Sequence, residues 1–299
     1  MKKAVLVTFL ISSFIFSQTK TDTLDLSEHP NMFTLSSRIN ETSGVEFYND
    51  HLYTFNDSGG NPEIYKLSAE DGSISQTIKI KNARNVDWEE IARKGDTLFI
   101  GDFGNNLGIR RDLTIYSIVL PKSNFPEKTK ADILNVIHFN FEDQTDFENR
   151  GYARTNFDCE ALIYYKGKLH LFSKCWGSNQ TVHYELYLQP SKDIMIAKKI
   201  ETFNTECVIT GADIHNDELY LIGYTWDGVA YVWKFSDFSK GMFFNGKAQK
   251  TLIGLSAAIG QTEGIAVTDD KIYITGEEIK HSFFHREPAL YILDKSEWK

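Results

Sequence analysis

Five oxygen-bearing side chains stand at one repeated position along this sequence. Each lies nine residues before the leading aliphatic residue of an apolar, strand-like segment. The five are Ser43, Glu89, Glu160, Thr210 and Glu263. Three carboxylates and two hydroxyls form an all-oxygen set of the kind that binds hard cations, and several ligands around a roomy site favour Ca²⁺ over Mg²⁺. Zinc would be expected to use His or Cys. The column therefore predicts a calcium site.

The same column has a second interpretation. Three carboxylates directed at one point repel one another and raise their pKa values unless a cation lies among them. The column itself contains no Lys or Arg, which favours a bound ion. Alternatively, each acid accepts hydrogen bonds from backbone amides of a neighbouring element. On either interpretation the column mainly stabilises the fold.

Five similar hairpins hold these positions. Each has a short strand, a tight turn of Asn, Asp, Gly or Lys, and a second strand of alternating apolar and aromatic residues. Successive units are 46, 71, 50 and 53 residues apart, which is enough for a four-stranded antiparallel blade. The first unit shows all four strands, SGVEF, LYTFN, EIYKL and ISQTIKI. We therefore predict an all-β fold, a five-bladed β-propeller whose first strands are innermost.

Two parts of the repeat are irregular. The 71-residue unit carries an insertion within residues 122–156, whose Pro, Lys, Asp and Glu content indicates a surface loop. The last unit ends at LYILDKSEWK with only three strands, and the early segment NMFTLSSRI is expected to supply its fourth. This N-terminal strand would close the last blade and remove open edges. No motif for a sixth blade is found, so residues 18–299 are expected to form a single domain.

Composition and the first residues indicate an exported protein. The opening MKKAVLVTFLISSFIFSQ is typical of a cleaved signal peptide, residues 1–17, with a short N-terminal anchor as the alternative. No other segment is long and apolar enough to cross a bilayer, so the mature chain is expected to be secreted or periplasmic. The net charge of −9 argues against nucleic acid as a partner.

The loops after each second strand are expected on the same side as the column, because a hairpin returns the chain to where it began. They comprise residues 56–60, 102–106, 174–180, 224–228 and 276–287. Together they predict a bowl over the ion, where ligands usually bind. The bowl is aromatic as well as acidic, which suits stacking on a sugar, a base or a peptide ring. Its aromatic residues are Trp176, Tyr224, Trp226, Phe283 and Phe284.

Polar residues of these loops could act on a ligand. Asp57 and Asp102 are candidate general bases that direct water, and Asn105 could ligate a cation or orient water. Lys174 and Arg110 are the candidate cations for an anionic group. The simpler alternative is that NDSGG and DFGNN only make turns.

Histidine and cysteine give weaker signals. His281 and His285 are four apart, but the sequence shows no third ligand for a metal. Cys159, Cys175 and Cys207 are expected near the bowl, where one disulfide is geometrically feasible. No His accompanies a Cys in the motif, so a catalytic thiol is not expected.

The order Ser, Glu, Glu, hydroxyl, Glu on five innermost strands resembles that of the calcium-activated nucleotidases, or apyrases. The similarity extends to FNDSGG, DWEEIARKGDTLFIGDFGNN and TEGIAV. These relatives are secreted five-bladed propellers with a central calcium. The resemblance implies that the five column residues bind calcium and that the bowl binds a nucleoside di- or triphosphate. This chain departs from the pattern, because its first loop has no Arg and its second has Asn where Lys would be expected.

Three functions are compatible with these residues. The first is a calcium-dependent hydrolase of phosphate esters or anhydrides. The second is a non-catalytic module in which calcium is structural and the bowl binds a small molecule, glycan, peptide or partner protein. A five-bladed glycosidase would need carboxylates at catalytic separation in the bowl, and Asp57, Asp102 and Glu277 are the available ones. The oligomeric state is not set by the sequence.

Overall fold

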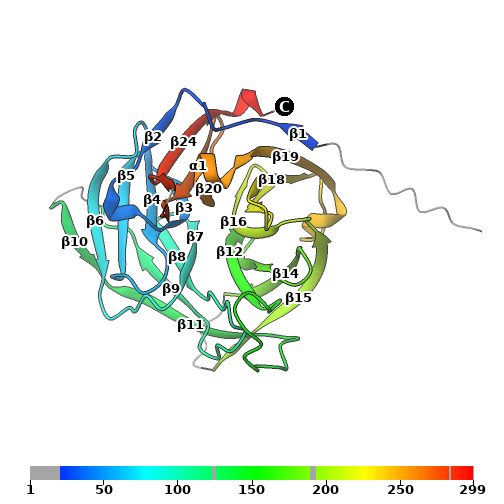
Figure 1. The fold of residues 1–299 in the computed structure, drawn as a ribbon. Coiled ribbons are helices and arrows are strands. Elements are labelled where there is room, and N and C mark those ends of the chain that lie inside the picture. The colour runs from blue at the N-terminus through cyan, green and yellow to red at the C-terminus, as the bar shows by residue number, and fades with distance from the viewer. Residues whose placement is uncertain (1–20, 123–125, 189–192, 283, 299) are drawn as a thin grey trace, which may run out of the picture.

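The computed structural model describes residues 21–122, 126–188, 193–282 and 284–298. The predicted signal peptide, residues 1–17, and Phe283 lie outside the described residues. The described chain is all-β apart from one short helix, α1 (Ser256–Ile259), and three short 3₁₀ turns. Figure 1 shows its sheets arranged around a common centre.

The first sheet contains the four strands that the sequence predicts. They are β3 (Thr42–Tyr48), β4 (His51–Asn56), β5 (Glu63–Ser68) and β6 (Ile74–Ile80), paired antiparallel in chain order. The β3–β4 turn places Asn49 and Asp50 at φ 48° and 61°, the left-handed geometry that matches the twist of a two-residue hairpin. Asn and Asp adopt it with little strain, which explains why these residue types recur in the turns.

The second and third hairpin units join into one eight-stranded sheet. The second unit supplies β7 (Trp88–Lys94), β8 (Thr97–Asp102), β9 (Thr114–Val119) and β11 (Ile133–Phe141). The third supplies β12 (Asp158–Tyr165), β13 (Lys168–Lys174), β14 (Gln180–Tyr187) and β15 (Met195–Asn204). The outer strands β11 and β15 pair in parallel and connect the two units.

The expectation of a surface loop over residues 122–156 is wrong for its central part. This segment contains β11 and also β10 (Lys128–Ala131), which pairs in parallel with β6 of the first sheet. The physical reason is the alternation in β11, where Ile137, Phe139 and Phe141 are buried and intervening residues face outward. The polar flanks dominate the composition of the segment and obscure this alternation.

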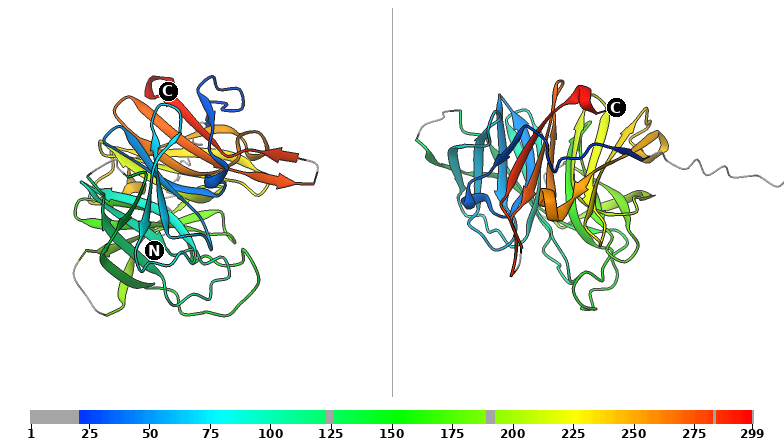
Figure 2. Two further views of the ribbon diagram at one scale, coloured as in Figure 1. Left: turned by 90° about the vertical axis from the view of Figure 1, so that its left-hand side faces the viewer. Right: turned by 45° about the horizontal axis from the view of Figure 1, so that its top comes forward.

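The remaining strands form two further sheets and a small hairpin. The fourth unit has β16 (Val208–His215), β17 (Glu218–Tyr224), β18 (Val229–Ser236) and β19 (Lys247–Leu255), with β1 (Thr21–Thr23) parallel to β19. The last sheet has β20 (Gln261–Val267), β21 (Lys271–Glu277) and β24 (Ala289–Asp294). Its fourth strand, β2 (Met32–Thr34), comes from the predicted N-terminal segment and pairs with β24. The hairpin β22 (Ile279–His281) and β23 (Phe284–Arg286) projects beyond the sheets (Figure 2).

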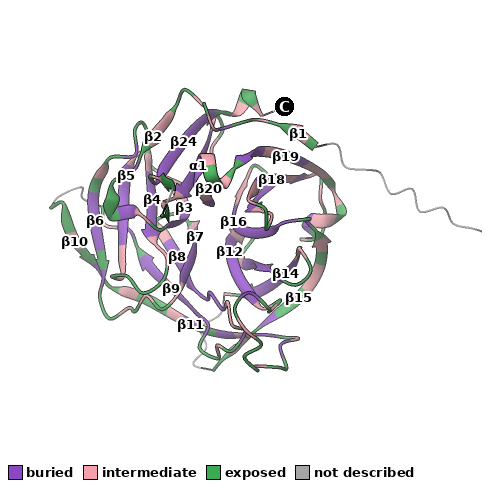
Figure 3. Cartoon of the chain, viewed as in Figure 1, coloured by how far each residue is buried: buried purple, intermediate pink, exposed green. Residues whose placement is uncertain are grey.

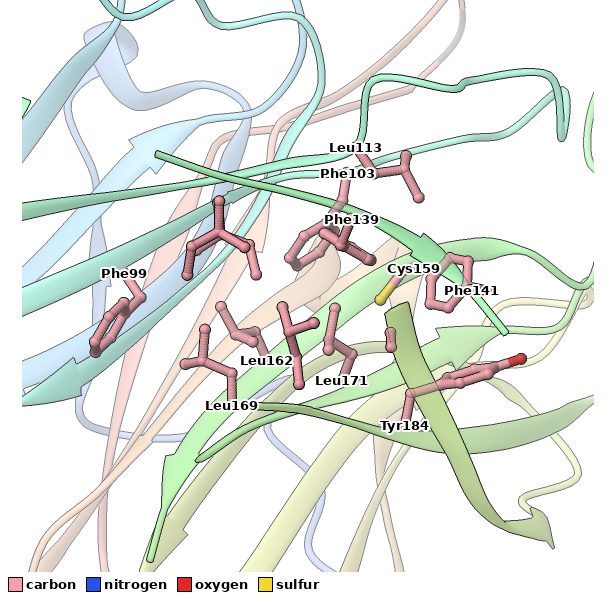
Figure 4. Close-up of a cluster of buried hydrophobic side chains, with 14 of the residues drawn as sticks. Phe99, Phe103, Leu113, Phe139, Phe141, Cys159, Leu162, Leu169, Leu171 and Tyr184 are labelled. Atoms are coloured by element: carbon pink, nitrogen blue, oxygen red, sulfur yellow. The ribbon is translucent and has the colours of Figure 1, made fainter. Parts of the chain in front are cut away.

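The first strands of the units surround the centre. Strand β3 contacts β7, β7 contacts β12, β12 contacts β16, β16 contacts β20, and β20 contacts β3. These strands are largely buried at the end where each begins (Figure 3). Apolar side chains fill the space between neighbouring sheets, as in the cluster of Phe103, Phe139 and Leu162 between the second and third units (Figure 4). Burying one such side chain contributes about 1.5–3 kcal/mol.

Candidate metal centre

Every column residue lies at a break in the strand register. Each of the five first hairpins has a register shift in its pairing, and each shift contains the column position. The five are Ser43, Glu89, Glu160, Thr210 and Glu263. A β-bulge leaves one residue out of the ladder and re-aims its side chain. The repeated spacing in the sequence therefore reflects a repeated bulge near the centre.

The two hydroxyls of the column connect neighbouring first strands. Ser43 Oγ donates to the Glu89 carbonyl oxygen at 2.6 Å, and Thr210 Oγ1 donates to the Thr262 carbonyl oxygen at 2.7 Å. Both hydroxyls thus stabilise the fold directly. Their role as calcium ligands stays a prediction.

The three glutamates of the column belong to a larger group of carboxylates, here called the acid cluster. They lie where the first strands begin and the second strands end, and this side of the molecule is here called the mouth. The seven members are Asp57, Asp87, Glu89, Asp158, Glu160, Glu263 and Glu277. Three overlapping triplets have one ligand oxygen from each residue, all within 4.8 Å of one another: Asp57–Asp87–Glu89, Asp57–Glu263–Glu277 and Glu89–Asp158–Glu160. The last triplet is fully buried and can hold a metal ion.

Of the four cluster acids outside the column, Asp57 and Glu277 were predicted as bowl acids, whereas Asp87 and Asp158 were not predicted as ligands. Asp87 and Asp158 each stand two residues before a column glutamate, and a spacing of two puts side chains on the same face of a strand. Glu277 is the last residue of β21 and pairs with Gln261 of β20. Gln261 in turn stands two residues before Glu263. These spacings were the available signal.

Lys174 supplies a cation that the column lacks. It ends β13, and its Nζ lies 2.5 Å from Glu160 Oε2 and 3.3 Å from the Tyr224 hydroxyl, with the side chain only 3% exposed. Burial is the largest single influence and lowers the pKa of Lys174, but Glu160 together with Tyr224, Glu263 and Asp158 outweighs it and raises this pKa well above its usual value. The predicted phosphate-binding lysine is therefore already paired inside the cluster.

Hydrogen-bond donors are distributed unevenly among the acids. Asp158 accepts from the Asn105 amide at 2.6 Å and from Trp176 Nε1 at 2.6 Å, and its oxygens are satisfied. In contrast, no described residue donates a hydrogen bond to the side chains of Asp57, Asp87 or Glu89. Asp57 Oδ1 is buried without a partner, which marks a position where a cation would be stabilised.

Burial and the charges of neighbouring acids raise the pKa values of these three carboxylates. Burial, followed by the charge of Glu263, raises the pKa of Asp57 well above its usual value. Burial and then Glu160 do the same to the pKa of Glu89. The pKa of Asp87 rises to about 6, mainly through burial and secondly through Asp158. Each shift describes a carboxylate that a nearby cation would return to the ionised form.

Gly104 of the DFGNN loop lies directly against this donor-free triplet. A Cβ at Gly104 would lie 2.0 Å from Glu89 Oε1 and 2.4 Å from Asp87 Oδ2. Only glycine permits so close an approach of the backbone. The loop thus fits tightly around the two carboxylates.

The other predicted polar residues of this loop form a support for the cluster. Asp102 accepts from the Asp87 amide at 3.2 Å and from Arg110 Nη2 at 2.9 Å, and Arg110 Nε also donates to Asp112. Asn105 is buried, and its Oδ1 accepts from the Arg110 amide. Asp102 and Arg110 are therefore paired with each other. Their catalytic and substrate-binding roles stay predictions.

Aromatic side chains line the mouth above the cluster. The ring of Trp176 lies 4.9 Å from that of Trp226 and 6.3 Å from that of Tyr152, and Lys174 Nζ lies 4.4 Å from its centre. Trp226 and Tyr152 are 64% and 70% exposed. The sequence prediction included both tryptophans but missed Tyr152.

Histidine and cysteine contribute little to this site. His285 Nε2 lies 2.9 Å from Glu278 Oε1 on the projecting hairpin, and the metal-capable groups among the described residues contain no histidine. All three cysteines are buried and free, so the feasible disulfide is not formed. Burial raises the pKa of Cys159 well above its usual value, which disfavours a thiolate.

No protein-family model matches the sequence, and no curated protein matches it. Among solved structures, an exo-β-1,3-galactanase from Phanerochaete chrysosporium matches with a TM-score of 0.52 at 9% identity, over 92% of this chain and 63% of that one. A GH43 β-1,3-galactosidase matches with a TM-score of 0.48 at 11% identity, over 89% and 94%. A putative glucose dehydrogenase from Thermus thermophilus matches with a TM-score of 0.47 at 8% identity, over 88% and 99%. The similarity is one of fold, and the chain is an all-β protein with β-propeller neighbours.

Proposed function

We propose that this chain is a five-bladed β-propeller that binds calcium in the acid cluster and a small ligand in the bowl above it. The closed series of contacts among β3, β7, β12, β16 and β20 supports five blades. The pairing of β2 with β24 supports closure of the last blade by an N-terminal strand. The observation that carries the metal site is the buried, unpartnered oxygen of Asp57 beside two further donor-free carboxylates.

Calcium suits this set of residues better than other common ions. All available ligands are oxygens, and Ca²⁺ accepts six to eight of them in flexible geometry. Asp57, Asp87 and Glu89 would hold the ion, because their oxygens have no competing donor. Glu160 and Glu263 lie close enough to contribute charge, although Glu160 is paired with Lys174. This ligand set shifts the predicted site from the column toward the loops.

Binding of a ligand is better supported than hydrolysis of a phosphate. A bound calcium ion would polarise a ligand oxygen and lower the pKa of water. Asp57 would then be the residue placed to orient water. The two predicted phosphate-binding cations, however, are paired: Lys174 with Glu160, and Arg110 with Asp102 and Asp112. Hydrolysis of phosphate esters or anhydrides therefore remains the second candidate.

The proposed protein is exported from the cytoplasm. The signal-like residues 1–17 predict a secreted or periplasmic protein. None of the helices among the described residues is long and apolar enough to span a membrane. Extracytoplasmic calcium concentrations suit sites of moderate affinity.

Calorimetric titration of EDTA-treated protein with calcium tests the metal site. We expect Asp57→Asn to weaken calcium binding at least 10-fold, because it removes the donor-free carboxylate charge. The control is Asp132→Asn, which changes an exposed acid paired with Lys81 and should leave the affinity unchanged. Equal affinities in both variants, or no calcium binding by the wild type, would overturn the proposal. A panel of nucleoside phosphates, with calcium and with EDTA, tests the hydrolase alternative.

A further inference from the structure

We propose that the bowl binds a neutral saccharide, with the sugar ring against Trp226 and Tyr152 and its hydroxyls donating to the acid cluster. This inference rests on the proposed function in one respect, that the bowl binds a ligand, and it names the ligand class. Three independent features of the mouth support it: exposed aromatic rings, a surplus of acceptors and a cation position that is already occupied.

The first feature is the row of aromatic rings. Trp176 is its centre and is fixed from below, because its Nε1 donates to Asp158 Oδ2 at 2.6 Å. Trp226 and Tyr152 flank it at ring distances of 4.9 and 6.3 Å, and both are largely exposed. Adjacent exposed aromatic rings are unfavourable in water and are typical of a surface that a ligand covers.

The backbone that carries Trp226 is also held in place before any ligand binds. It lies in a tight turn in which Thr225 Oγ1 donates to Asp227 Oδ1 at 2.5 Å and the Gly228 amide donates to the Thr225 carbonyl oxygen at 2.8 Å. A rigid aromatic side chain loses little conformational entropy on binding. The ordered turn and the contact with the Trp176 ring at 4.9 Å together present the face of Trp226.

The second feature is the balance of donors and acceptors. Three donors around the cluster already have partners: Lys174 bonds Glu160, Trp176 bonds Asp158, and Gln261 Nε2 bonds Glu263 at 2.6 Å. The carboxylates of Asp57 and Asp87 receive no hydrogen bond from any described residue. Each carboxylate has about four lone-pair sites, so these acids can ligate the proposed calcium ion and still accept the hydroxyl donors that a sugar supplies. A phosphate group offers acceptors and negative charge, and it is disfavoured because the seven carboxylates outnumber the charges of one bound Ca²⁺ and Lys174.

The third feature separates a sugar from an organic cation. Aromatic rings next to carboxylates also bind ammonium groups. Here the ammonium of Lys174 already lies 4.4 Å from the Trp176 ring centre and 5.3 Å from that of Tyr224. The position that a ligand cation would take is filled by the chain itself. The exposed faces of Trp226 and Tyr152 remain for the apolar face of a sugar ring.

The test is a titration of calcium-loaded protein followed by tryptophan fluorescence and calorimetry. The probes are neutral mono- and oligosaccharides, with spermidine and ADP as the competing ligand classes. We expect at least one neutral saccharide to bind, and Trp226→Ala to weaken it at least 10-fold. The matched control is Tyr187→Ala, because Tyr187 is 49% exposed on β14, away from the mouth; its saccharide affinity should be unchanged.

The outcomes distinguish this inference from the proposed metal site. Saccharide binding that survives Trp226→Ala, or binding of only spermidine or ADP, would overturn the saccharide site. Calcium affinity is measured separately and should be the same in Trp226→Ala and in the wild type. Calcium binding without any saccharide binding contradicts the inference alone. Saccharide binding by a protein that binds no calcium contradicts the proposed metal site alone.

Discussion

The first strands carry one set of carboxylates at the mouth and another farther along the strands, and the two sets differ in their hydrogen-bond donors. Beyond the mouth, around a cavity of about 50 Å³, Glu46 accepts from Arg93 Nε at 3.1 Å. Asp213 accepts from two backbone amides at 2.6 and 2.7 Å, and Glu90 from two at 2.9 and 2.7 Å. We call Glu46, Glu90 and Asp213 the far-end group. Each of its acids has donors of its own.

The mouth has more acids and fewer donors. Lys174 is the cation in direct contact with Glu160 of the acid cluster, and Asp57 keeps a buried oxygen without a partner. Buried polar groups that stabilise a fold are normally hydrogen-bonded. The comparison therefore assigns the far-end group to stability and the donor-free part of the acid cluster to a ligand. The following predictions test this division.

The largest effect is expected from Lys174→Met. Removal of one partner from a buried ion pair costs about 3–5 kcal/mol, because the other charge is left uncompensated. We expect this loss of unfolding free energy in EDTA, and a smaller loss in saturating calcium, since the ion would compensate Glu160. Urea denaturation in the two media measures both. An equal loss in EDTA and calcium would show that Lys174 acts through packing alone; Lys81→Met, at an exposed pair, should change little.

Glu90→Ala should have the second-largest effect. Glu90 is fully buried, and its two oxygens bridge the Ile91 amide and, across the centre, the Ala212 amide. Each buried donor left without an acceptor costs about 1–3 kcal/mol, which gives about 2–6 kcal/mol for the two amides. Removing the buried carboxylate also relieves its desolvation penalty, so a net loss of about 2–4 kcal/mol is expected. Calcium should not reduce this loss.

Asp57→Ala, measured by the same denaturation, should cost less than about 1 kcal/mol of unfolding free energy, since no donor loses a partner. Similar losses for both variants would contradict the division.

Glu46→Gln should have the smallest effect, visible as a change in pH dependence. Burial, followed by the charge of Asp213, raises the pKa of Glu46 from 4.5 to about 8, with Arg93 opposing and Glu90 also nearby. A raised folded-state pKa stabilises the protein fully below 4.5, and this contribution is lost as pH rises through about 8. Glutamine does not titrate, so melting temperatures of the variant should fall less between these pH values. Parallel curves for variant and wild type would refute the assignment.

Much of the fold follows from local patterns in the sequence. Alternating apolar residues and turn residues such as Asn49 and Asp50 locate the strands of the first sheet. The fixed offset of Glu89 and Glu160 locates the bulges. Residues 133–141 were missed because their alternation is short and lies between polar flanks. An apolar alternation that repeats in several units predicts its strands, whereas one that occurs once between polar segments is easily missed.

The site could be predicted only in part, for a physical reason. The sequence predicts that Glu89, Glu160 and Glu263 lie together, because each occupies the same position in its hairpin unit. It does not reveal which acids have donors, since these are often backbone amides of other units, as with Ala212 for Glu90. Lys174 lies opposite Asp158 in the strand register, yet its burial against Glu160 depends on packing around Tyr224. The number of hydrogen-bond donors that each acid receives is therefore set only when the sheets have packed together.

The pairing of β2 with β24 has a consequence for how the chain reaches its native state. It joins Met32–Thr34 to Ala289–Asp294, so contacts near the two ends of the chain form the same sheet. Contacts at such separation have a high loop-closure entropy and form slowly. Until β24 is available, β2 has no partner and the last sheet keeps an open edge that can pair with other chains. Completion of this sheet should therefore be a late step in folding, and the step at which aggregation competes most strongly.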